Sequence, residues 1–230
     1  MRRVIESELL DHLPPGDPRA VASRGDLRRL NFIMGHAGVF AQALPARTDT
    51  SRPIHLVELG AGDGTFLLRL ARNWAQRGVR AHVTLVDRLD LLAPQTRHAF
   101  ASLNWTLDYV REDVLSWLEN TPATADAMLA NLFLHHFPDD SLKNLLRLAA
   151  RKTRNFIACE PRRAPLALTA ARWLWLIGCN AVTRHDAVVS VRAGFRGREL
   201  STLWPEAPGW RSNERPTGLF SHCFSAQRHA

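Results

Sequence analysis

The chain has 230 residues, of which 46% are hydrophobic and 23% charged, values that exclude a disordered protein and fit one globular domain. Basic residues outnumber acids by 30 to 22, which gives a net charge of +8, but only Lys143 and Lys152 are lysines and the arginines are scattered. We therefore interpret the charge as a dispersed, solvated surface and expect no nucleic-acid partner.

The three cysteines, Cys159, Cys179 and Cys223, share no metal-ligand spacing, so we expect reduced thiols, no metal site and a cytoplasmic protein. The N-terminus lacks the apolar core of a signal peptide. The most apolar stretch, 166–182, contains Arg172 and is too short to span a bilayer securely. It predicts a buried or lid helix and no stable membrane insertion.

The first 50 residues are predicted to form a helical cap that is separate from the rest of the chain. Prolines between residues 14 and 18 break any helix, and Asp26 suits the cap or first turn of the helix that follows. Apolar residues then recur at helical spacing: Leu27, Leu30, Ile33 and Met34. A polar run over 45–53 ends the cap, so we divide the chain into domains 1–50 and 51–230.

From residue 54 on, short apolar runs alternate with amphipathic segments. The predicted strands are 54–59, 82–87, 106–112, 126–133 and 155–160, and the predicted helices include 66–74, 94–103 and 139–149. Repeated strand–helix units predict a doubly wound α/β fold, in which helices cover both faces of a mostly parallel sheet. Two further strands, 210–214 and 219–227, are joined by a turn over 215–218, so the sheet is expected to end in an antiparallel hairpin.

Three glycines, Gly60, Gly62 and Gly64, stand at alternate positions between the first strand and its helix. Glycine there permits a tight turn and lets a ligand approach the backbone at a helix N-terminus. A dinucleotide-binding loop has its third glycine three residues after the second, where this chain has Thr65. Glu58, which precedes the loop, would repel a pyrophosphate but suits a ligand with a cationic amino group.

Acids follow the next two strands, at the edge where open sheets bind ligands. Asp87 closes the second strand, where it can accept hydrogen bonds from ribose hydroxyls. Asp113 follows the third strand beside Val114, where it can accept a hydrogen bond from an adenine amino group. Any one of these acids, and Asp63 in the loop, also suits a helix cap. Four acids and three glycines at matching strand ends favour a ligand site over capping alone.

These motifs resemble those of the class I S-adenosylmethionine-dependent methyltransferases, from residue 54 to the C-terminus. The matching segments are 57–64, 85–88, 112–114, 131–139 and 159–161. The resemblance implies a seven-stranded sheet with its last strand antiparallel and S-adenosylmethionine as the cofactor. The cofactor-binding residues that it implies are Glu58, Gly60, Ala61, Gly62, Gly64, Asp87, Arg88, Asp113, Val114 and Asn131.

The same resemblance implies how the cofactor lies along the sheet edge. Gly60 and Gly62 are expected against the methionine part and Asp87 at the ribose. Asp113 is expected at the adenine, and Asn131 near the sulfonium.

His135 and His136 follow the fourth strand, where the cofactor methyl group should project. His135 is therefore a candidate base for a hydroxyl that is being methylated. The segment is similar to the Leu-His-Asp-Trp run of phenol O-methyltransferases, in which the first histidine is the base, but His136 replaces the aspartate. A structural histidine pair that holds the loop is the alternative, and we assign His136 to acceptor binding.

A second histidine cluster lies within about 162–200, an interval that often builds the acceptor pocket in this superfamily. His185 is a second candidate base with Asp186 as its partner, and Arg192 is a candidate to hold an anionic or phenolate acceptor. The alternative is a surface ion pair beside a core helix. Tryptophans and aliphatic residues before this cluster are expected to be core residues or a lid over a lipidic acceptor: Trp173, Leu174, Trp175 and Ile177.

Residues 17–20, 25–31 and 184–196 resemble a bacterial methyltransferase group that often accompanies chalcone-synthase-like polyketide synthases. This resemblance implies O-methylation of a small-molecule acceptor of phenolic or alkyl-pyrone type, aromatic or lipidic. The alternatives are an RNA or DNA methyltransferase, a non-catalytic cofactor-binding partner protein and a nicotinamide dehydrogenase. Nothing in the sequence pattern specifies an oligomeric state.

Overall fold

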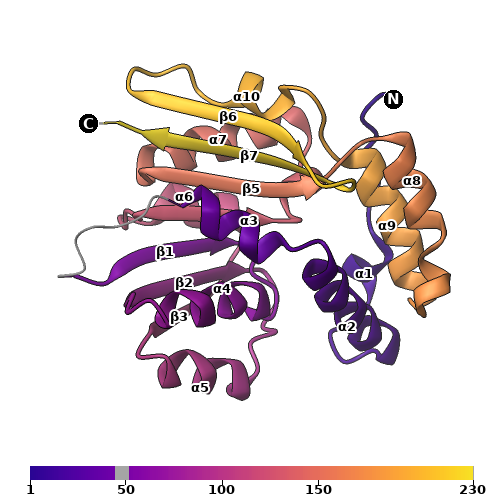
Figure 1. Ribbon diagram of the computed structural model, residues 1–230, viewed down its shortest axis with the longest axis horizontal. Coiled ribbons are helices and arrows are strands. Elements are labelled where there is room, and N and C mark those ends of the chain that lie inside the picture. The colour runs from indigo at the N-terminus through magenta and orange to yellow at the C-terminus, as the bar shows by residue number, and fades with distance from the viewer. Residues whose placement is uncertain (45–51, 230) are drawn as a thin grey trace.

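A seven-stranded sheet forms the centre of the computed structural model, which describes residues 1–44 and 52–229 (Figure 1). Its strands lie in the order β3-β2-β1-β4-β5-β7-β6. They are β1 (Ile54–Leu59), β2 (Ala81–Asp87), β3 (Thr106–Arg111), β4 (Ala127–Asn131), β5 (Asn155–Pro161), β6 (Trp210–Thr217) and β7 (Ser221–Arg228). Only β7 pairs antiparallel with its neighbours β5 and β6, which confirms the predicted sheet. The predicted boundary between residues 50 and 51 lies outside the described residues.

Helices cover both faces of the sheet, and each face has its own hydrophobic core. One core packs α3 (His36–Ala43), α4 (Thr65–Ala75) and α5 (Pro94–Ser102) against the strands. The other packs α6 (Val114–Asn120), α7 (Asp139–Lys152) and α10 (Glu199–Leu203). β4 is buried along its whole length, as the apolar run predicts for a central parallel strand. The carboxyl ends of the parallel strands therefore meet at one edge, where the glycine loop lies.

The N-terminal helices α1 (Leu9–His12) and α2 (Pro18–Ile33) lie over that edge beside α9 (Ala181–Ala193) (Figure 1). α2 begins at Pro18 with Asp17 as its N-cap, so the prediction that Asp26 begins this helix was wrong. Asp26 is buried midway along α2 and instead serves the start of α9. Its Oδ2 accepts hydrogen bonds from Asn180 N and Thr183 Oγ1 at 2.8 and 3.0 Å. This carboxylate fastens the N-terminal helices to α9.

The apolar stretch 166–182 is not one helix, contrary to the prediction. It divides into α8 (Pro165–Arg172) and a 3₁₀ turn, η2 (Leu174–Ile177), and the chain reverses at Gly178, whose φ is 76°. The side chains of Trp173 and Trp175 are 54% and 52% exposed, so they are not core residues. Among the described residues, no helix has the length and apolar character that a membrane span requires.

The C-terminal hairpin turns later than predicted. β6 continues to Thr217, which pairs with Ser221, and Gly218 with φ of 62° begins the turn. Inside the hairpin, His222 Nε2 lies 2.8 Å from Glu214 Oε1, and both side chains are buried.

Candidate active site

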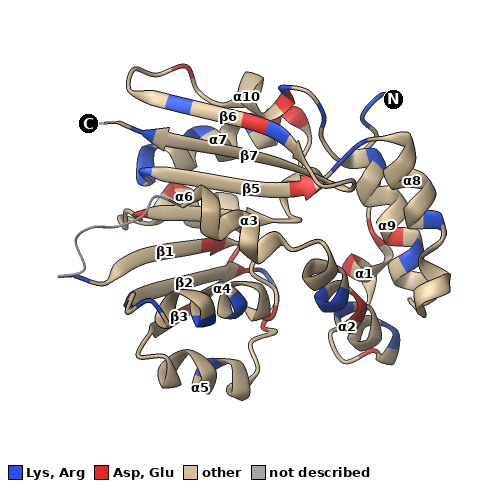
Figure 2. Ribbon diagram, in the orientation of Figure 1, with Lys and Arg blue, Asp and Glu red and all other residues tan. Residues whose placement is uncertain are grey.

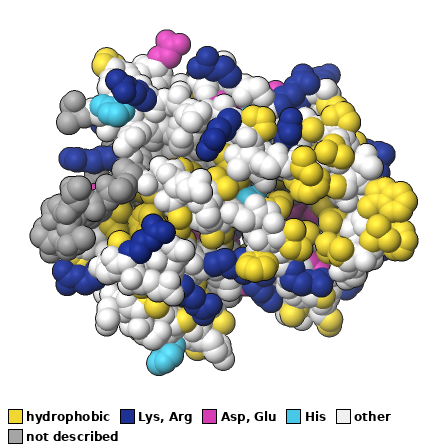
Figure 3. All heavy atoms as spheres, viewed as in Figure 1, with side chains coloured by type: hydrophobic (Ala, Val, Ile, Leu, Met, Phe, Trp, Pro, Cys, Tyr) yellow, Lys and Arg dark blue, Asp and Glu magenta, His cyan; other side chains and the backbone are white. Residues whose placement is uncertain are grey.

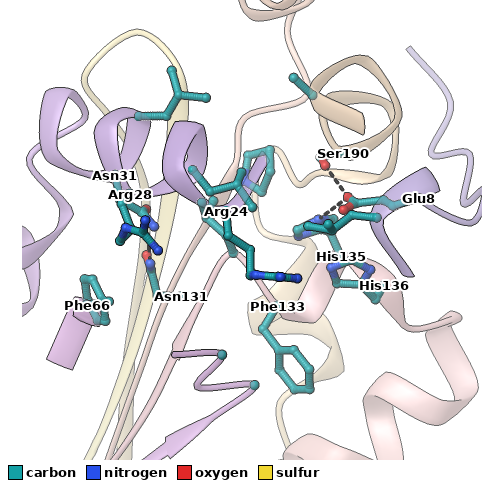
Figure 4. A pocket seen from close by; sticks show the side chains of 18 of the residues that line it. Glu8, Arg24, Arg28, Asn31, Phe66, Asn131, Phe133, His135, His136 and Ser190 are labelled. Atoms are coloured by element: carbon teal, nitrogen blue, oxygen red, sulfur yellow. Dashed lines mark hydrogen bonds and ion pairs between the residues drawn. The ribbon is translucent and has the colours of Figure 1, made fainter. Parts of the chain in front are cut away.

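A cavity of about 570 Å³ lies at the carboxyl ends of β1, β2 and β4 and is bordered by α1, α2, α8 and α9 (Figure 4). Most of the predicted site residues line it. They are Glu58, Gly60, Ala61, Gly62, Asp87, Arg88, Asp113, Val114, Asn131, His135 and His136. Gly64, His185, Asp186 and Arg192 do not line it.

The glycine loop turns from β1 into α4 through left-handed backbone, with φ of 67° at Gly60, 56° at Gly62 and 71° at Gly64. No atom lies within 4 Å of a Cβ built on Gly62, so the loop backbone is open to a ligand there. A Cβ on Gly60 would lie 2.1 Å from Phe133 Cδ2, and one on Gly64 would lie 2.7 Å from Leu85 Cδ1. Gly64 therefore serves helix packing, and Gly62 serves the cavity.

Glu58 is a buried carboxyl group whose Oε2 has no hydrogen-bond partner among the described residues. Burial raises its pKa well above the usual value, and the charges of Asp63 and Asp87 raise it further. An ammonium group beside Glu58 would supply both the missing donor and the opposite charge. The carboxyl group therefore fits the cationic amino group of S-adenosylmethionine.

Asp87 and Asp113 organise the backbone at this edge and keep acceptor capacity. The two oxygens of Asp87 accept from Gly62 N at 2.8 Å and from Leu89 N at 2.9 Å, and a carboxylate oxygen can accept a second bond. Asp113 caps α6, because its Oδ1 accepts from Leu115 N at 2.9 Å. Its Oδ2 accepts no hydrogen bond from the described residues. Capping and ligand binding are therefore compatible for these acids.

Asn131 ends β4, two residues earlier than predicted, because Leu132 turns the chain with φ of 53°. Its side chain is held between two N-terminal helices. Asn131 Oδ1 lies 2.7 Å from His36 Nδ1, and Asn131 Nδ2 donates to Asn31 Oδ1 at 3.2 Å. Burial lowers the pKa of His36, and its Nε2 lies 2.7 Å from Ser221 Oγ. A neutral His36 that donates from Nδ1 therefore fixes the orientation of the Asn131 amide.

His135 lies in the 3₁₀ turn η1 (Leu134–His136) and is buried between two carboxylates. Its Nδ1 lies 2.7 Å from Glu160 Oε2, and its Nε2 lies 3.3 Å from Glu8 Oε1. Glu160 has no solvent exposure and also accepts from the backbone N–H groups of Phe133 and Leu134. Glu160 therefore fixes both the ring of His135 and the turn that carries it.

The charges of this cluster follow from its contacts. Burial lowers the pKa of His135, but the hydrogen bonds to Glu160 and Glu8 outweigh it and raise the pKa to about 9. Burial raises the pKa of Glu8, but the contact with His135 lowers it to about 2. Burial and the charge of His135 both lower the pKa of His136. At neutral pH His135 is therefore an imidazolium, Glu8 a carboxylate and His136 a neutral histidine.

The second predicted cluster lies apart from the cavity. His185 Nδ1 lies 3.0 Å from Asp186 Oδ1, as the prediction of a pair requires, but half of the His185 side chain is exposed. Asp186 is buried and accepts from the backbone N–H groups of Leu9 and Leu10, so it anchors α1. Arg192 is exposed and lies 4.0 Å from Glu6. These positions favour the surface-pair alternative over an acceptor site.

Several cavity residues had no sequence-based assignment. Glu8 accepts from Ser190 Oγ and faces His135, and Arg24 extends from α2 into the cavity (Figure 4). Arg28 joins α2 to the glycine loop through a 2.8 Å contact with Asp63. Glu160, which is buried against His135 and does not line the cavity, had a signal in the sequence: its place at the end of β5 in the matching segment 159–161. Glu8 and Arg24 reach the site through tertiary packing alone.

The segment around the glycine loop matches a known family. Residues 56–155 match the family model described as a methyltransferase domain. The match covers less than half of the chain, and this segment is similar to methyltransferase domains. The chain matches no curated protein sequence.

Solved structures with the same fold include three methyltransferases. The plantazolicin methyltransferase BamL, solved with a desmethylplantazolicin analogue and S-adenosylhomocysteine, has a TM-score of 0.64 at 9% identity, over 93% of this chain and 92% of that one. The mitomycin 7-O-methyltransferase MmcR has a TM-score of 0.61 at 22% identity, over 97% of this chain. The dimethyltransferase RosA from Streptomyces davawensis, which acts on 8-amino-8-demethyl-D-riboflavin, has a TM-score of 0.58 at 17% identity, over 97% of this chain. This chain spans 61% of the MmcR chain and 62% of the RosA chain.

Proposed function

Because residues 56–155 match a methyltransferase domain, we propose that the protein is an S-adenosylmethionine-dependent methyltransferase. Its proposed reaction is the methylation of a hydroxyl group of a small apolar acceptor, with His135 as the base. The observation that carries this proposal is the pairing of His135 with the buried Glu160 in the cavity that also holds the glycine loop. Glu160 holds Nδ1 at 2.7 Å, whereas Nε2 faces Glu8 at the longer distance of 3.3 Å. We therefore assign Nε2 as the ring atom that takes the proton, from an acceptor hydroxyl that replaces Glu8 as its partner.

The proposed cofactor site follows the sheet edge. Glu58 binds the amino group of the methionine part, against the open backbone of Gly62. Asp87 accepts from the ribose hydroxyls, with Arg88 beside it. Asp113 Oδ2 accepts from the adenine amino group. Three observations support this assignment: the buried unpartnered oxygen of Glu58, the open space at Gly62 and the unoccupied acceptor of Asp113.

The adenine also contacts Val114, and the loop backbone at Gly60 and Ala61 lies against the methionine part. Asn131, which lines the cavity and is oriented by His36 and Asn31, lies near the sulfonium. S-adenosylmethionine supplies an electrophilic methyl group at this point. The chain's own contribution is to orient the two reactants and to remove a proton.

The remaining cavity wall is apolar, which supports an aromatic or lipidic acceptor. It includes Leu30, Met34, Ala167, Ala171, Val191 and Phe220. The small side chains of the alanines leave room on this wall. The resemblance to the polyketide-associated group supports a phenolic or polyketide-derived metabolite, and MmcR is an O-methyltransferase of similar fold. His136 lies beside His135 on this wall and is assigned to acceptor binding.

The proton on His135 sets the expected pH dependence. With a pKa of about 9, the ring is protonated at neutral pH, and base catalysis needs its neutral form. The rate therefore rises as pH approaches about 9. A phenol has a pKa of about 10, close enough to that of His135 for efficient proton transfer. In this reaction the acceptor hydroxyl would give its proton to His135 Nε2, and S-adenosylmethionine would supply the methyl group.

A pH–rate profile with labelled S-adenosylmethionine and a panel of alkyl phenols, naphthols and matched anilines tests this function. We expect hydroxyl methylation and, for His135→Asn, a loss of about 100-fold to 10,000-fold in kcat. The affinity for S-adenosylhomocysteine, measured by calorimetry, should stay within about twofold, since His135 is outside the proposed cofactor site. Full activity of His135→Asn rejects the base, and methylation of the anilines alone rejects the hydroxyl acceptor.

We also propose that the protein is cytoplasmic and acts on small molecules rather than nucleic acids. Its three cysteines are buried free thiols, which suits a reducing compartment. Lys and Arg are distributed over many helices and strands (Figure 2). Nucleic-acid binding measured over a salt series tests the second point, because phosphate contacts weaken steeply with salt. Tight binding with a steep salt dependence would contradict it.

A further inference from the structure

Large apolar side chains lie in the open beside the cavity. We define the apolar rim as Ile33, Trp173, Trp175, Leu176 and Ile177, whose exposed fractions lie between 49% and 67%. Figure 3 shows hydrophobic side chains gathered on the side of the molecule where α2, α8 and α9 lie. Contiguous exposed apolar surface of this kind marks an interaction site.

Backbone geometry holds the apolar rim away from the core. α8 ends at Arg172, and the 3₁₀ turn that follows reverses at Gly178 with φ of 76°. The rings of Trp173 and Trp175 stack with centroids 6.0 Å apart and an interplanar angle of 29°. Neither indole N–H donates to another described residue. Tryptophans with an apolar ring and a solvated N–H are enriched at the headgroup level of membranes.

Positive charge flanks the apolar rim. Arg172 and Arg184 are exposed, and neither forms an ion pair with a described residue. By contrast, the α2 residue Arg29 is paired with Asp26, and Arg19 is paired with its cap, Asp17. The unpaired arginines, in a chain of net charge +8, favour an anionic partner.

The apolar rim is also continuous with the cavity wall. Ile33 and Ile177 are both about half or more exposed and line the cavity, as Leu174 does. A surface that covers the apolar rim therefore also faces the cavity mouth. Such a surface can deliver an apolar acceptor without transfer through water.

We propose that the apolar rim docks this protein reversibly onto an anionic lipid bilayer. Trp173 and Trp175 then lie at the headgroup level, and Arg172 and Arg184 contact the anionic headgroups. A second copy of the chain fits less well, because two facing rims would bring unpaired arginines together. This docking is independent of the proposed acceptor, since it uses only the outer surface.

Co-sedimentation of the full chain with vesicles tests the proposal, without cofactor or acceptor. Phosphatidylcholine vesicles with and without phosphatidylserine are the probes. We expect binding to the phosphatidylserine vesicles that weakens with salt, and little binding to phosphatidylcholine alone. Trp173→Ala with Trp175→Ala should lower the partition coefficient at least about tenfold. Both residues are exposed, so the melting temperature should be unchanged.

A charge-matched pair separates the flanking arginines from net charge. Arg172→Gln with Arg184→Gln should weaken binding by about fivefold for each charge removed. Lys143→Gln with Arg151→Gln removes the same charge from exposed positions on α7 and should have a much smaller effect. Equal effects of the two pairs, or equal binding to both vesicle types, would overturn the proposal. So would a dimer in sedimentation velocity that the double tryptophan variant dissolves, with no vesicle binding by either protein.

Discussion

The two halves of the cavity are built in different ways. In the proposed cofactor half, Glu58, Gly62 and Asp87 lie at or just after the ends of the neighbouring strands β1 and β2. They are close in the sequence as well as in the fold. In the proposed acceptor half, His135 meets Glu8 across 127 residues. Parallel strands bring the first set together by topology alone, whereas the second set depends on how the N-terminal helices pack.

This difference has a consequence for charge. The cofactor half contains a buried acid without a partner, Glu58, which fits a cation supplied by a ligand. The acceptor half is already paired, since His135 has a carboxylate on each side. Ligand binding should therefore stabilise the cofactor half more than the acceptor half. Amino-acid substitutions should destabilise the acceptor half more than the cofactor half.

The largest effect is expected for Glu160→Gln in the acceptor half. The amide cannot accept all the hydrogen bonds that this buried carboxylate receives, so stability should fall by roughly 3 kcal/mol or more. The value of kcat should fall more than about 100-fold, because His135 loses its orienting partner. Thermal unfolding and steady-state kinetics measure the two effects.

Glu214→Gln is the matched control for that variant, because Glu214 forms a buried pair with His222 inside the hairpin. It should lower stability in the same way and leave the kcat of the folded protein within about threefold. If both variants lose activity equally, the Glu160 contact has no special role in the reaction.

A large effect on binding rather than stability is expected for Glu58→Gln in the cofactor half. The Kd for S-adenosylhomocysteine should rise about 10-fold to 100-fold, which corresponds to the usual free-energy contribution of a charged hydrogen bond. The melting temperature without ligand should not fall, because a buried unpaired acid is replaced by a neutral group. Calorimetry and thermal shift measure both quantities, and a destabilised protein with unchanged affinity would contradict the assignment.

An intermediate effect is expected for Glu8→Gln, which removes one of the two carboxylates that raise the pKa of His135. The rate should reach its maximum at a lower pH than in the natural protein. Because the folded pKa of His135 is raised, its contribution to stability is present in full below about 6.5 and is lost as pH rises through about 9.

In Glu8→Gln that loss of stability should be smaller and should be complete at a lower pH, because the folded pKa of His135 is lower. Melting temperatures from neutral to about pH 10 show the shift, with the unchanged protein as reference. A pH–rate profile identical to that of the natural protein would mean that Glu8 does not act on His135.

The smallest effect is expected for His185→Ala. Half of this side chain is exposed, it does not line the cavity, and among the described residues its only hydrogen-bond partner is Asp186. Stability should change by no more than about 0.5 kcal/mol and kcat by less than about threefold. A loss of tenfold or more in kcat would restore His185 as a candidate base and bring the second cluster back into the acceptor half.

The fold was predictable because the relevant signals are local. Apolar strand runs and amphipathic helices indicate where each element lies, and the order of strand–helix units indicates a parallel sheet. The hairpin was predicted, although its turn lies later because Arg215, Pro216 and Thr217 pair with β7. Composition could not show that 166–182 breaks at Trp173, since the same apolar residues suit one buried helix or two exposed segments.

Only part of the proposed site was predictable, and for the same reason. Glu58, Asp87 and Asp113 could be identified because each lies at a strand end. Glu8 and His36 could not, because each lies in a separate N-terminal helix or cap, and their contacts with His135 and Asn131 arise only after packing. His185 had a suggestive neighbour in Asp186, but the structure uses that carboxylate to hold α1.

His36 bears on which fragment of the chain could keep the proposed site intact. It lies on α3, outside the segment 56–155 that matches the methyltransferase domain, yet it contacts Asn131 at the end of β4. A fragment that begins at β1 would keep the matched segment and lose the group that orients this amide. For the proposed reaction, the smallest catalytic unit is therefore larger than the matched segment. Grafting the N-terminal helices of another methyltransferase onto this sheet would exchange part of the reaction centre along with the cover.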